Sequence, residues 1–244
     1  MKSDEFKENL LTLICAKGNS EGVKKKNLVK INGKTLLGLG IIKAQQNNLK
    51  YICVSSEDNL ILNNAKKYGV KPFFKRNKNL SLQNVAKEDV WKDAIKRAEI
   101  YFKKTFKYVL DIDITNPLLD RTDLDQFLTL SLKKLKSRWN GVFCVSDSRR
   151  NPYFNILIKN NKNGFKRCLN KPFKEIYSRQ KAPKTYDHIA GYYCFRKDYL
   201  LKKKNSLFEK NIYAFKVEQS KAFDIDTLDD LKIIRILHKN INKK

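Results

Sequence analysis

The sequence predicts an α/β fold built on a mainly parallel β-sheet. From Leu10 to Ser146, short apolar runs typical of buried strands alternate with amphipathic segments typical of helices. Such alternation indicates a parallel sheet with right-handed crossovers and helices on both faces. After Ser146, proline and glycine interrupt the rhythm, and we expect an antiparallel excursion from the main sheet at about residues 150–185.

Five strands and four helices are expected in the alternating part. The run from Leu10 to Ala16 is short and unbroken by charge, as in a strand buried on both faces, and the charged N-terminus should lead straight into it. Asp58 is the expected N-cap of a helix that runs to Tyr68 and stops at Gly69. The other strands are expected at 51–55, 70–74, 108–113 and 141–146, and the other helices at 35–47, 86–101 and 123–136.

The last part of the chain should return to the sheet. A strand-like segment is expected at 153–158 within the excursion, and strands at 191–195 and 213–217 beyond it. A terminal amphipathic helix should run from Leu228 to about His238. Because ligands of parallel sheets bind beyond the carboxyl ends of the strands, we expect the loop after the first strand and the end of strand 108–113 to lie at one site.

The net charge of +27 would attract polyanionic substrates. A basic nucleic-acid-binding protein is the non-enzyme alternative. Only ten of the 52 basic residues are arginine, however, and the lysines are spread along the whole chain. Specific nucleic-acid readers depend on arginine forks and clustered patches, so the composition disfavours this class.

Membrane and secreted classes are also disfavoured. The sequence has no run of eighteen apolar residues, and its charged N-terminus lacks the apolar core of a signal peptide. Five cysteines lie apart, mostly within apolar runs, and form no C-x-x-C pair. These features predict reduced, buried thiols in a cytoplasmic protein.

The loop after the first strand is the first candidate ligand site. Its small polar residues are Gly18, Asn19, Ser20 and Gly22, and donors around it come from Lys17, Lys24, Lys25, Lys26 and Asn27. Glycine can take a positive φ and lets a backbone approach a ligand closely. Backbone amides with ammonium groups suit a phosphate-bearing ligand. The loop lacks the Walker A and dinucleotide spacings, and a solvated lysine-rich turn is the alternative.

Two pairs of aspartates are candidates for binding a metal or a substrate. Asp224 and Asp226 alternate in an extended segment, so both carboxylates should share one face and suit Mg²⁺. The alternative is that Asp226 only belongs to the N-cap region of the last helix. Asp111 and Asp113 repeat this spacing at a strand end. They could hold a second metal or bind a sugar or base, and their D-x-D form is also that of nucleotide-sugar glycosyltransferases.

A polar cluster precedes the strand at 191–195. Arg179 could form a forked interaction with a carboxylate, and Gln180 and His188 lie nearby in the sequence. A surface loop is the alternative interpretation. No Ser/His/Asp or Cys/His constellation is visible, so covalent catalysis is not expected.

Several of these segments together resemble one family, the acylneuraminate (nonulosonate) cytidylyltransferases, which make CMP-activated sialic-acid-like sugars. Ala16–Leu28 is similar to the family's opening block A-R-x-x-S-K-G-x-x-x-K-N-L, and Thr115–Leu118 to its T-S-P-L. Arg179–Gln180 fits its R-Q block, and Phe223–Leu231 fits its D-I-D-T-x-x-D-L. The blocks follow the family's order over nearly the whole chain.

The resemblance implies a Rossmann-like nucleotidyltransferase fold, one cytidylyltransferase domain over residues 1–244, and a homodimer built through the inserted antiparallel segment. It implies transfer of CMP from CTP to a nonulosonic acid, release of pyrophosphate and a requirement for Mg²⁺. Asp224 and Asp226 would hold the metal. The expected residues are Lys26, Asp224 and Asp226 for catalysis, Lys17, Gly18, Asn19, Ser20, Gly22, Lys26 and Asn27 for the nucleotide, and Asp111, Asp113, Arg179 and Gln180 for substrate binding.

Four positions depart from the family pattern. Lys17 and Leu119 stand where the family has arginine, and Glu21 stands where it has a phosphate-binding lysine. Asp113 stands where a substrate-contacting glutamine is common, and carboxylates on this strand occur in enzymes resembling the legionaminate group. This favours a bacterial nonulosonate other than the commonest sialic acid. A related nucleotidyltransferase that uses Kdo or a hexose phosphate is the nearest alternative.

Overall fold

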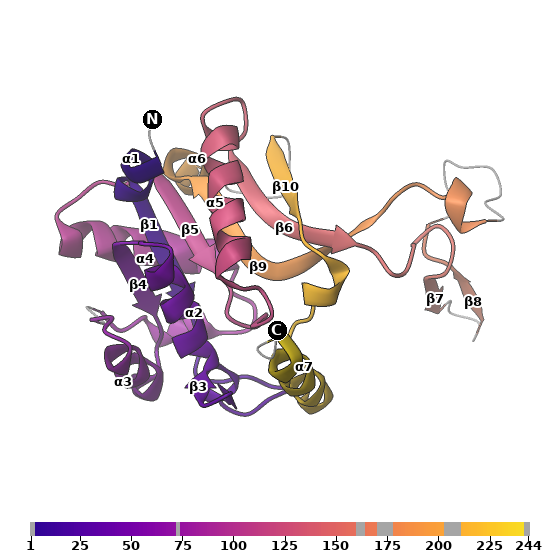
Figure 1. Cartoon of the computed structure of the whole chain (residues 1–244), viewed down its shortest axis with the longest axis horizontal. Coiled ribbons are helices and arrows are strands. Elements are labelled where there is room, and N and C mark those ends of the chain that lie inside the picture. The colour runs from indigo at the N-terminus through magenta and orange to yellow at the C-terminus, as the bar shows by residue number, and fades with distance from the viewer. Residues whose placement is uncertain (1–2, 72–73, 160–163, 170–177, 203–210, 242–244) are drawn as a thin grey trace.

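The computed structural model describes residues 3–71, 74–159, 164–169, 178–202 and 211–241. A six-stranded sheet in this part of the chain has the order β10-β6-β9-β5-β1-β4 (Figure 1). Its strands are β1 (Leu10–Cys15), β4 (Tyr51–Ser55), β5 (Tyr108–Ile112), β6 (Gly141–Asp147), β9 (Tyr186–Arg196) and β10 (Ile212–Lys216). The helices are α1 (Ser3–Glu8), α2 (Leu36–Gln46), α3 (Asn59–Lys67), α4 (Lys87–Phe102), α5 (Arg121–Leu135), α6 (Lys197–Lys202) and α7 (Leu228–Ile241).

The sheet is mainly parallel, which confirms the expected fold class. β1 pairs in parallel with β4 and β5, and β10 pairs in parallel with β6. β9 is the exception, because it runs antiparallel between β5 and β6. A separate small hairpin, β2 (Lys30–Ile31) with β3 (Lys34–Thr35), connects the loop after β1 to α2.

Side chains that alternate along the strands build a core on each face of the sheet. On one face, Leu10 and Ile14 of β1 belong to the core that includes residues of α2, α3, α5 and α7. On the other face, Leu11 and Leu13 belong to the core that includes residues of α4 and α6. Because β1 is buried on both faces, its sequence is continuously apolar.

A bulge in β9 links the sheet to the acidic segment before α7. Phe143 of β6 pairs with Tyr193, but Val145 pairs with His188, so β9 carries extra residues between the two pairs. A bulge frees backbone groups from the ladder for other partners. The amide of Ala190 in this bulge donates a hydrogen bond to the Asp224 carboxylate at 3.2 Å.

Two expectations about the first half of the chain are wrong. The charged N-terminus forms α1 and buries Phe6, instead of leading straight into β1. The expected strand at 70–74 does not form at residues 70, 71 and 74, and residues 72 and 73 lie outside the described residues. Val70 is buried against the core after α3, which explains its apolar, strand-like character without a strand.

The helix starts follow from capping residues. Asp58 caps α3 as predicted, and the chain leaves that helix through Gly69 at φ +81°. The helix expected at 123–136 begins earlier, at Arg121. Asp120 accepts the amide of Asp123, and the Asp123 carboxylate accepts the amide of Asp120, which forms a reciprocal cap.

The described residues 148–159, 164–169 and 178–185, which we call the arm, lie between β6 and β9 in the chain, and their hairpin projects from the body (Figure 1). The arm carries the antiparallel hairpin of β7 (Leu157–Lys159) and β8 (Phe165–Arg167), which confirms the expected antiparallel excursion. The strand expected at 153–158 begins only at Leu157, because the carbonyl of Asn151 accepts several following amides and closes a turn.

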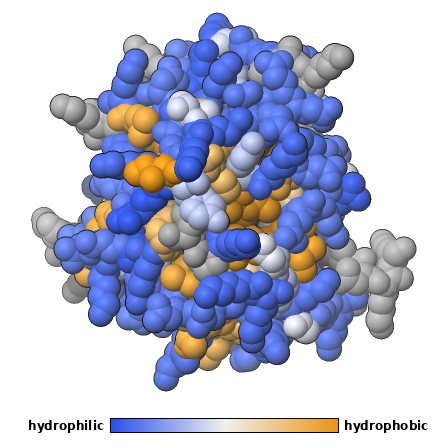
Figure 2. Space-filling model, turned by 90° about the vertical axis from the view of Figure 1, so that its left-hand side faces the viewer, coloured by the Kyte–Doolittle hydropathy of each residue, from blue (hydrophilic) through white to orange (hydrophobic). Residues whose placement is uncertain are grey.

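The hydrophilic surface and the free cysteines agree with what the composition predicts. The side of the body that carries α3 and α4 is largely hydrophilic, with hydrophobic residues gathered near its middle (Figure 2). All five cysteines are free, and Cys168 is the exposed one. In the part of the chain that the structure describes, no helix is long and apolar enough to cross a membrane.

Candidate active site

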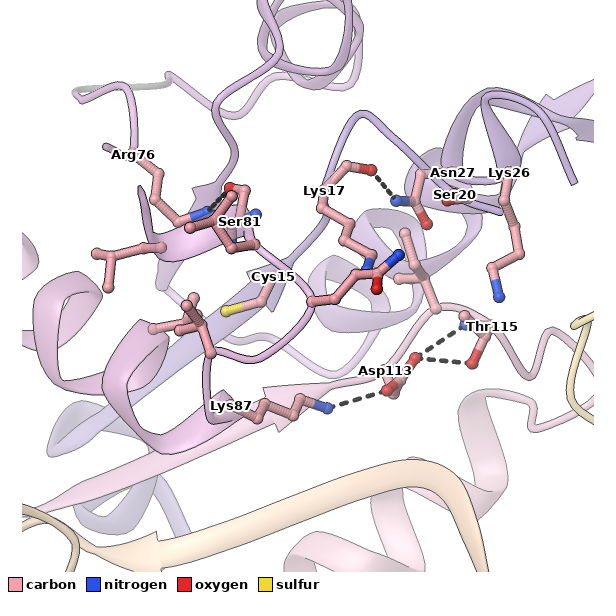
Figure 3. Close-up of a pocket in the computed structure, with 16 residues that line it drawn as sticks. Cys15, Lys17, Ser20, Lys26, Asn27, Arg76, Ser81, Lys87, Asp113 and Thr115 are labelled. Carbon is pink, nitrogen blue, oxygen red and sulfur yellow. Dashed lines mark hydrogen bonds and ion pairs between the residues drawn. The ribbon is translucent and has the colours of Figure 1, made fainter. Parts of the chain in front are cut away.

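A cavity of about 310 Å³ lies at the carboxyl ends of β1 and β5, as the fold class predicts. Its walls are the loop after β1, the segment 76–87 and the end of β5 (Figure 3). Its polar lining consists of Lys17, Ser20, Lys26, Asn27, Arg76, Ser81, Gln83, Lys87, Asp113 and Thr115. A cavity of this size with convergent polar groups is typical of a small-molecule site.

The loop after β1 and the segment before α7 touch each other beside this cavity. Lys26 donates from its ammonium group to the carbonyl of Ile225 at 2.6 Å and to the carboxylate of Asp226 at 3.0 Å. A Cβ atom on Gly22 would lie 1.8 Å from the carbonyl oxygen of Asp226, so only glycine fits at this contact. The fold therefore brings the early basic loop and the late acidic pair together.

Asn27 closes the loop after β1. It is buried, and its side-chain amide donates to the carbonyl of Lys17 at 2.8 Å. The residues expected to bind a nucleotide divide into two groups. Lys17, Ser20, Lys26 and Asn27 line the cavity, whereas Gly18, Asn19 and Gly22 are not among its walls.

Glu57 joins the loop to the segment 76–87. One carboxylate oxygen accepts the amide of Gly18 at 2.6 Å, and the other accepts the Arg76 guanidinium at 2.8 Å and the Ser81 hydroxyl at 2.6 Å. The side chains of Glu57 and Arg76 are only 14% and 3% exposed. Burial raises the pKa of Glu57, but the hydrogen bonds from Ser81, Gly18 and Arg76 outweigh it and hold the pKa below its ordinary value.

The two loop glycines have a role different from the expected one. The glycines with positive φ in the described chain are Gly33 and Gly69, so neither Gly18 nor Gly22 uses that freedom. The amide of Gly18 is bonded to a carboxylate and does not point at a phosphate. A Cβ atom on Gly18 would lie 2.5 Å from Asp58, so both glycines permit close packing of protein against protein.

Lys87 lies between the two aspartates of the β5 end. Its ammonium nitrogen is 2.8 Å from Asp111 and 2.9 Å from Asp113, and it lies 4.4 Å from the centre of the Tyr193 ring. Burial lowers the pKa of Lys87, but the two carboxylates outweigh it and hold the pKa well above its ordinary value. A single ammonium group therefore pairs with two neighbouring carboxylates.

The two aspartates differ in their access to the cavity. Asp111 is 3% exposed and lies behind Lys87, so direct contact with a ligand is closed to it. Asp113 is 23% exposed and lines the cavity, and one of its oxygens accepts the hydroxyl of Thr115 at 2.8 Å. Lys87 occupies the place between the carboxylates that a metal would need in a glycosyltransferase-like D-x-D site. The glycosyltransferase alternative therefore lacks support.

Asp224 and Asp226 fit the binding of a divalent cation. Asp224 Oδ1 is buried and has no hydrogen-bond partner among the described residues. A bound cation would give this buried oxygen the partner that it lacks. Burial raises the pKa of Asp224 to about 6, and the charges of Asp113 and Asp226 add to it. The Asp226 side chain is 77% exposed.

The number of protein ligands also matters. Within the described ranges, no group of three or more histidine, cysteine, aspartate or glutamate side chains could hold a metal. Two carboxylates suffice for Mg²⁺, which takes its remaining ligands from water and substrate phosphates. The donor set therefore suits Mg²⁺ bound together with a phosphate ligand.

Asp226 does lie in the N-cap region of α7, but other side chains cap the helix. The Asp230 carboxylate accepts the amide of Thr227 at 2.7 Å, and the Thr227 hydroxyl accepts the amide of Asp230 at 3.2 Å. The amide of Asp226 also donates to Asp230, at 3.1 Å. The carboxylate of Asp226 is thereby left to face Lys26.

Arg179 and Gln180 lie in the arm, outside the chain segments that form this cavity. They belong to a short 3₁₀ helix, Arg179–Lys181, in the arm. Gln180 is not among the cavity walls, and the hairpin of the arm projects away from the body (Figure 1). A role at the cavity would require the arm of a second chain.

Sequence reasoning missed Glu57, Arg76, Ser81 and Lys87. Glu57 follows β4 at the sheet edge where the first loop also lies, and this position alone could have identified it. Arg76 is one of ten arginines in a lysine-rich chain, and an arginine in such a chain favours a fixed, forked partner. Lys87 and Ser81 carry no comparable signal, because one lysine or serine in this sequence resembles the others.

Comparisons with known proteins identify the family of the chain. A family model described as "Cytidylyltransferase" matches residues 11–242. The chain is 38% identical over 239 residues to the CMP-N,N'-diacetyllegionaminic acid synthase of Campylobacter jejuni, covering 96% of this chain and 98% of that one. It is 36% identical over 236 residues to the post-translational flagellin modification protein B of Campylobacter coli, covering 96% of each.

A solved structure shares the fold. The CMP:2-keto-3-deoxy-manno-octonic acid synthetase complexed with CTP superposes with a TM-score of 0.68 at 17% identity, covering 95% of this chain and 99% of that one. At this identity the likeness concerns the fold alone.

Replacing Glu57 by glutamine should destabilise the protein by about 3 kcal/mol, because Arg76 loses its buried ionic partner. The pKa of Glu57 lies below its ordinary value of 4.5, so its stabilising contribution is complete above that pH and is lost as the pH falls through the folded pKa. Urea unfolding at pH 7 and at pH 3 measures both effects. Glu5→Gln, at an exposed position, is the matched control. Equal unfolding free energies of Glu57→Gln and wild type at pH 7 would refute the assignment.

Proposed function

Because the chain belongs to the cytidylyltransferase family and is therefore a nucleotidyltransferase, we propose that it transfers CMP from CTP to a nonulosonic acid of the legionaminic type. The products are the CMP-sugar and pyrophosphate. The observation that carries the proposal is the contact of Lys26 with Ile225 and Asp226 beside the cavity, because it joins a phosphate-binding wall to a metal-binding pair. The similarity to the legionaminic acid synthase supports the class of sugar.

The basic wall of the cavity suits the triphosphate. Lys17 and Lys26 line it, and Asn27 fixes the backbone between them. In the proposed reaction, the anomeric hydroxyl of the sugar acid attacks the α-phosphorus of CTP. The bond from that phosphorus to the bridging oxygen of the β-phosphate breaks, and pyrophosphate leaves. Positioning of the reactants and neutralisation of the developing charge by the lysines supply most of the acceleration.

Asp224 and Asp226 are the residues that would hold Mg²⁺. The amide of Ala190 fixes one oxygen of Asp224, and Lys26 fixes Asp226, so both carboxylates are oriented before a ligand arrives. When bound, Mg²⁺ supplies Lewis-acid stabilisation of the charge on the phosphate oxygens. Lys26 limits the repulsion between the acidic pair and a triphosphate.

The departure at Glu21 is compatible with activity. Glu21 is exposed and is not among the cavity walls, and the lysines at positions 24 and 25 are exposed beside it. Charges in this environment are screened by solvent and salt.

Asp113 at the opposite wall is our candidate for contact with the sugar acid. The five free cysteines support a reducing compartment, the cytoplasm.

The arm is the proposed contact between two copies of the chain. Its large apolar side chains include Ile156, Leu157, Ile158, Phe165 and Leu169, all of which are exposed. Exposed apolar side chains gathered on one projecting segment are typical of a surface that packs against a partner. A homodimer formed in this way would bring Arg179 and Gln180 of one chain to the sugar acid at the cavity of the other.

A Kdo cytidylyltransferase is the second candidate, favoured by the fold shared with the CMP:2-keto-3-deoxy-manno-octonic acid synthetase. Incubation with CTP, Mg²⁺ and either N,N'-diacetyllegionaminic acid, other nonulosonic acids or Kdo separates the two functions. We expect pyrophosphate and a CMP-sugar from a nonulosonic acid. Turnover of Kdo alone would replace the proposed function with the second candidate, and no turnover of any sugar acid would contradict both.

Lys26→Ala should lower kcat by at least about 100-fold, because the triphosphate and Asp226 lose a shared ammonium group. Lys66→Ala, at an exposed position of α3, is the matched control and should leave kcat unchanged. Initial rates of pyrophosphate release at saturating CTP measure both variants. A Lys26→Ala enzyme with the wild-type rate would remove Lys26 from the mechanism.

Asp224→Asn tests the metal site through stability as well as activity. Burial raises the folded pKa of Asp224 to about 6, above its ordinary value of 3.8, so wild-type stability falls as the pH rises through this interval. Without metal, the asparagine variant should therefore melt higher than wild type at pH 7.5 and match it at pH 3.5. Mg²⁺ with CTP should raise the Tm of wild type more than that of the variant. An equal rise in both would argue against metal binding by Asp224.

Mixed dimers test the arm. Lys26→Ala and Arg179→Ala chains should each be inactive alone. If the arm serves the partner's cavity, every mixed dimer contains one cavity with both residues intact, and random mixing should restore about a quarter of the wild-type rate. Pyrophosphate release after co-refolding of equal amounts measures this. No recovery in dimers that contain both variants would mean that both residues act within one chain.

A further inference from the structure

A second cavity of about 360 Å³ lies beyond the loop that follows β5. Thr115 of this loop lines the first cavity, whereas Pro117 lines the second, and the two cavities share no lining residue. The remaining walls come from the β2–β3 hairpin, α2, the start of α5 and α7. The apolar part of its lining consists of Ile31, Leu39, Ile42, Pro117, Leu118 and Leu119.

The ionisable residues that line this second cavity are mostly basic. Its ionisable lining residues are Lys34, Lys43, Arg121, His238 and Asp120. The single acid, Asp120, is already occupied, because its carboxylate caps α5 and pairs with Lys221 at 2.9 Å. His238 is bonded to Asn32 at 3.0 Å. The lining therefore has an excess of positive charge that protein groups do not neutralise.

Lys43 shows this excess most clearly. Its residue is 8% exposed, and its ammonium lies 5.4 Å from the centre of the Tyr192 ring. No ion pair or hydrogen bond joins this ammonium to another described residue. Burial lowers the pKa of Lys43 to about 8 despite the attraction of Asp123 and Asp120. A buried charge without a partner is costly, and an anion in the cavity would remove that cost.

We propose that this second cavity binds a small organic anion, in which a phosphate or carboxylate group is attached to an apolar body. Lys43 and Arg121 face the anionic group, and the apolar lining takes the body. The volume is in the range of pockets for small molecules. The site lies outside the cavity assigned to CTP, so its occupancy does not depend on the transfer reaction.

Calorimetric titration with phenyl phosphate and with benzoate tests this proposal and distinguishes the two anionic groups. We expect wild type to bind at least one of them, and Lys43→Met to weaken that binding by at least about tenfold, since methionine keeps the side-chain length and removes the charge. Lys66→Met, at an exposed position of α3, is the matched control and should bind as wild type does. Inorganic phosphate should bind more weakly than phenyl phosphate, because it lacks the apolar body.

Three results would overturn the proposal: no binding of either probe to wild type, unchanged affinity in Lys43→Met, or an equal loss of affinity in Lys43→Met and Lys66→Met. Lys43→Met removes an unpaired buried charge, so its Tm at pH 7 should equal or exceed that of wild type. If this variant does not fold, Arg121→Gln takes its place, because Arg121 is exposed. Arg121→Gln should weaken binding of the same probe, and wild-type affinity in this variant would contradict the site. Turnover of CTP, measured separately, tests the transfer reaction independently.

Discussion

The site depends on the contact between Lys26 and the segment at Ile225 and Asp226. Lys26 and Ile225 are 199 residues apart in the sequence. Their segments can approach each other because Gly22 has no side chain. Without this contact, the loop after β1 and the acidic pair before α7 would be separate surface features. With it, an ammonium group and two carboxylates lie beside one cavity. This is the arrangement that a phosphate-bearing substrate and its metal require.

Two further charge networks hold the cavity walls in place. Glu57 connects Gly18 with Arg76 and Ser81, and Lys87 forms ion pairs with both Asp111 and Asp113. Buried ion pairs of this kind contribute little net stability, since desolvation offsets much of their attraction. Their value here is positional, because each network joins segments from different parts of the chain. Buried charges that add little net stability break a general rule of folding, and such exceptions are expected at functional sites.

β9 connects the cavity to the arm. Its bulge frees the Ala190 amide for Asp224, and at its start the chain emerges from the arm that carries Arg179 and Gln180. An antiparallel strand inserted between β5 and β6 therefore serves two purposes. It orients one of the acidic residues, and it carries the chain from the exposed arm back into the body. The proposed dimer would extend this connection from one chain to the other.

Hydrophobic periodicity determined most of the fold. The continuous apolar run of β1, the caps Asp58 and Gly69, and the strand–helix alternation are local properties of the sequence, so they could be predicted from it. The strand expected at 70–74 and the missed helix α1 show where such patterns fail. Val70 is buried without forming a strand, and the six-residue helix α1 is too short to show a periodic pattern although it buries Phe6.

The features of the candidate site also divide into those that the sequence predicted and those that only the structure revealed. Lys26, Asp224 and Asp226 could be selected because their residue types and spacing suit a phosphate and a metal. The sequence could not show that Glu57 takes the amide of Gly18, that Asp111 lies behind Lys87, or that Lys43 is buried without an ionic partner. Only the tertiary structure decided these points, because each depends on which distant side chains share a space and on how much water reaches them.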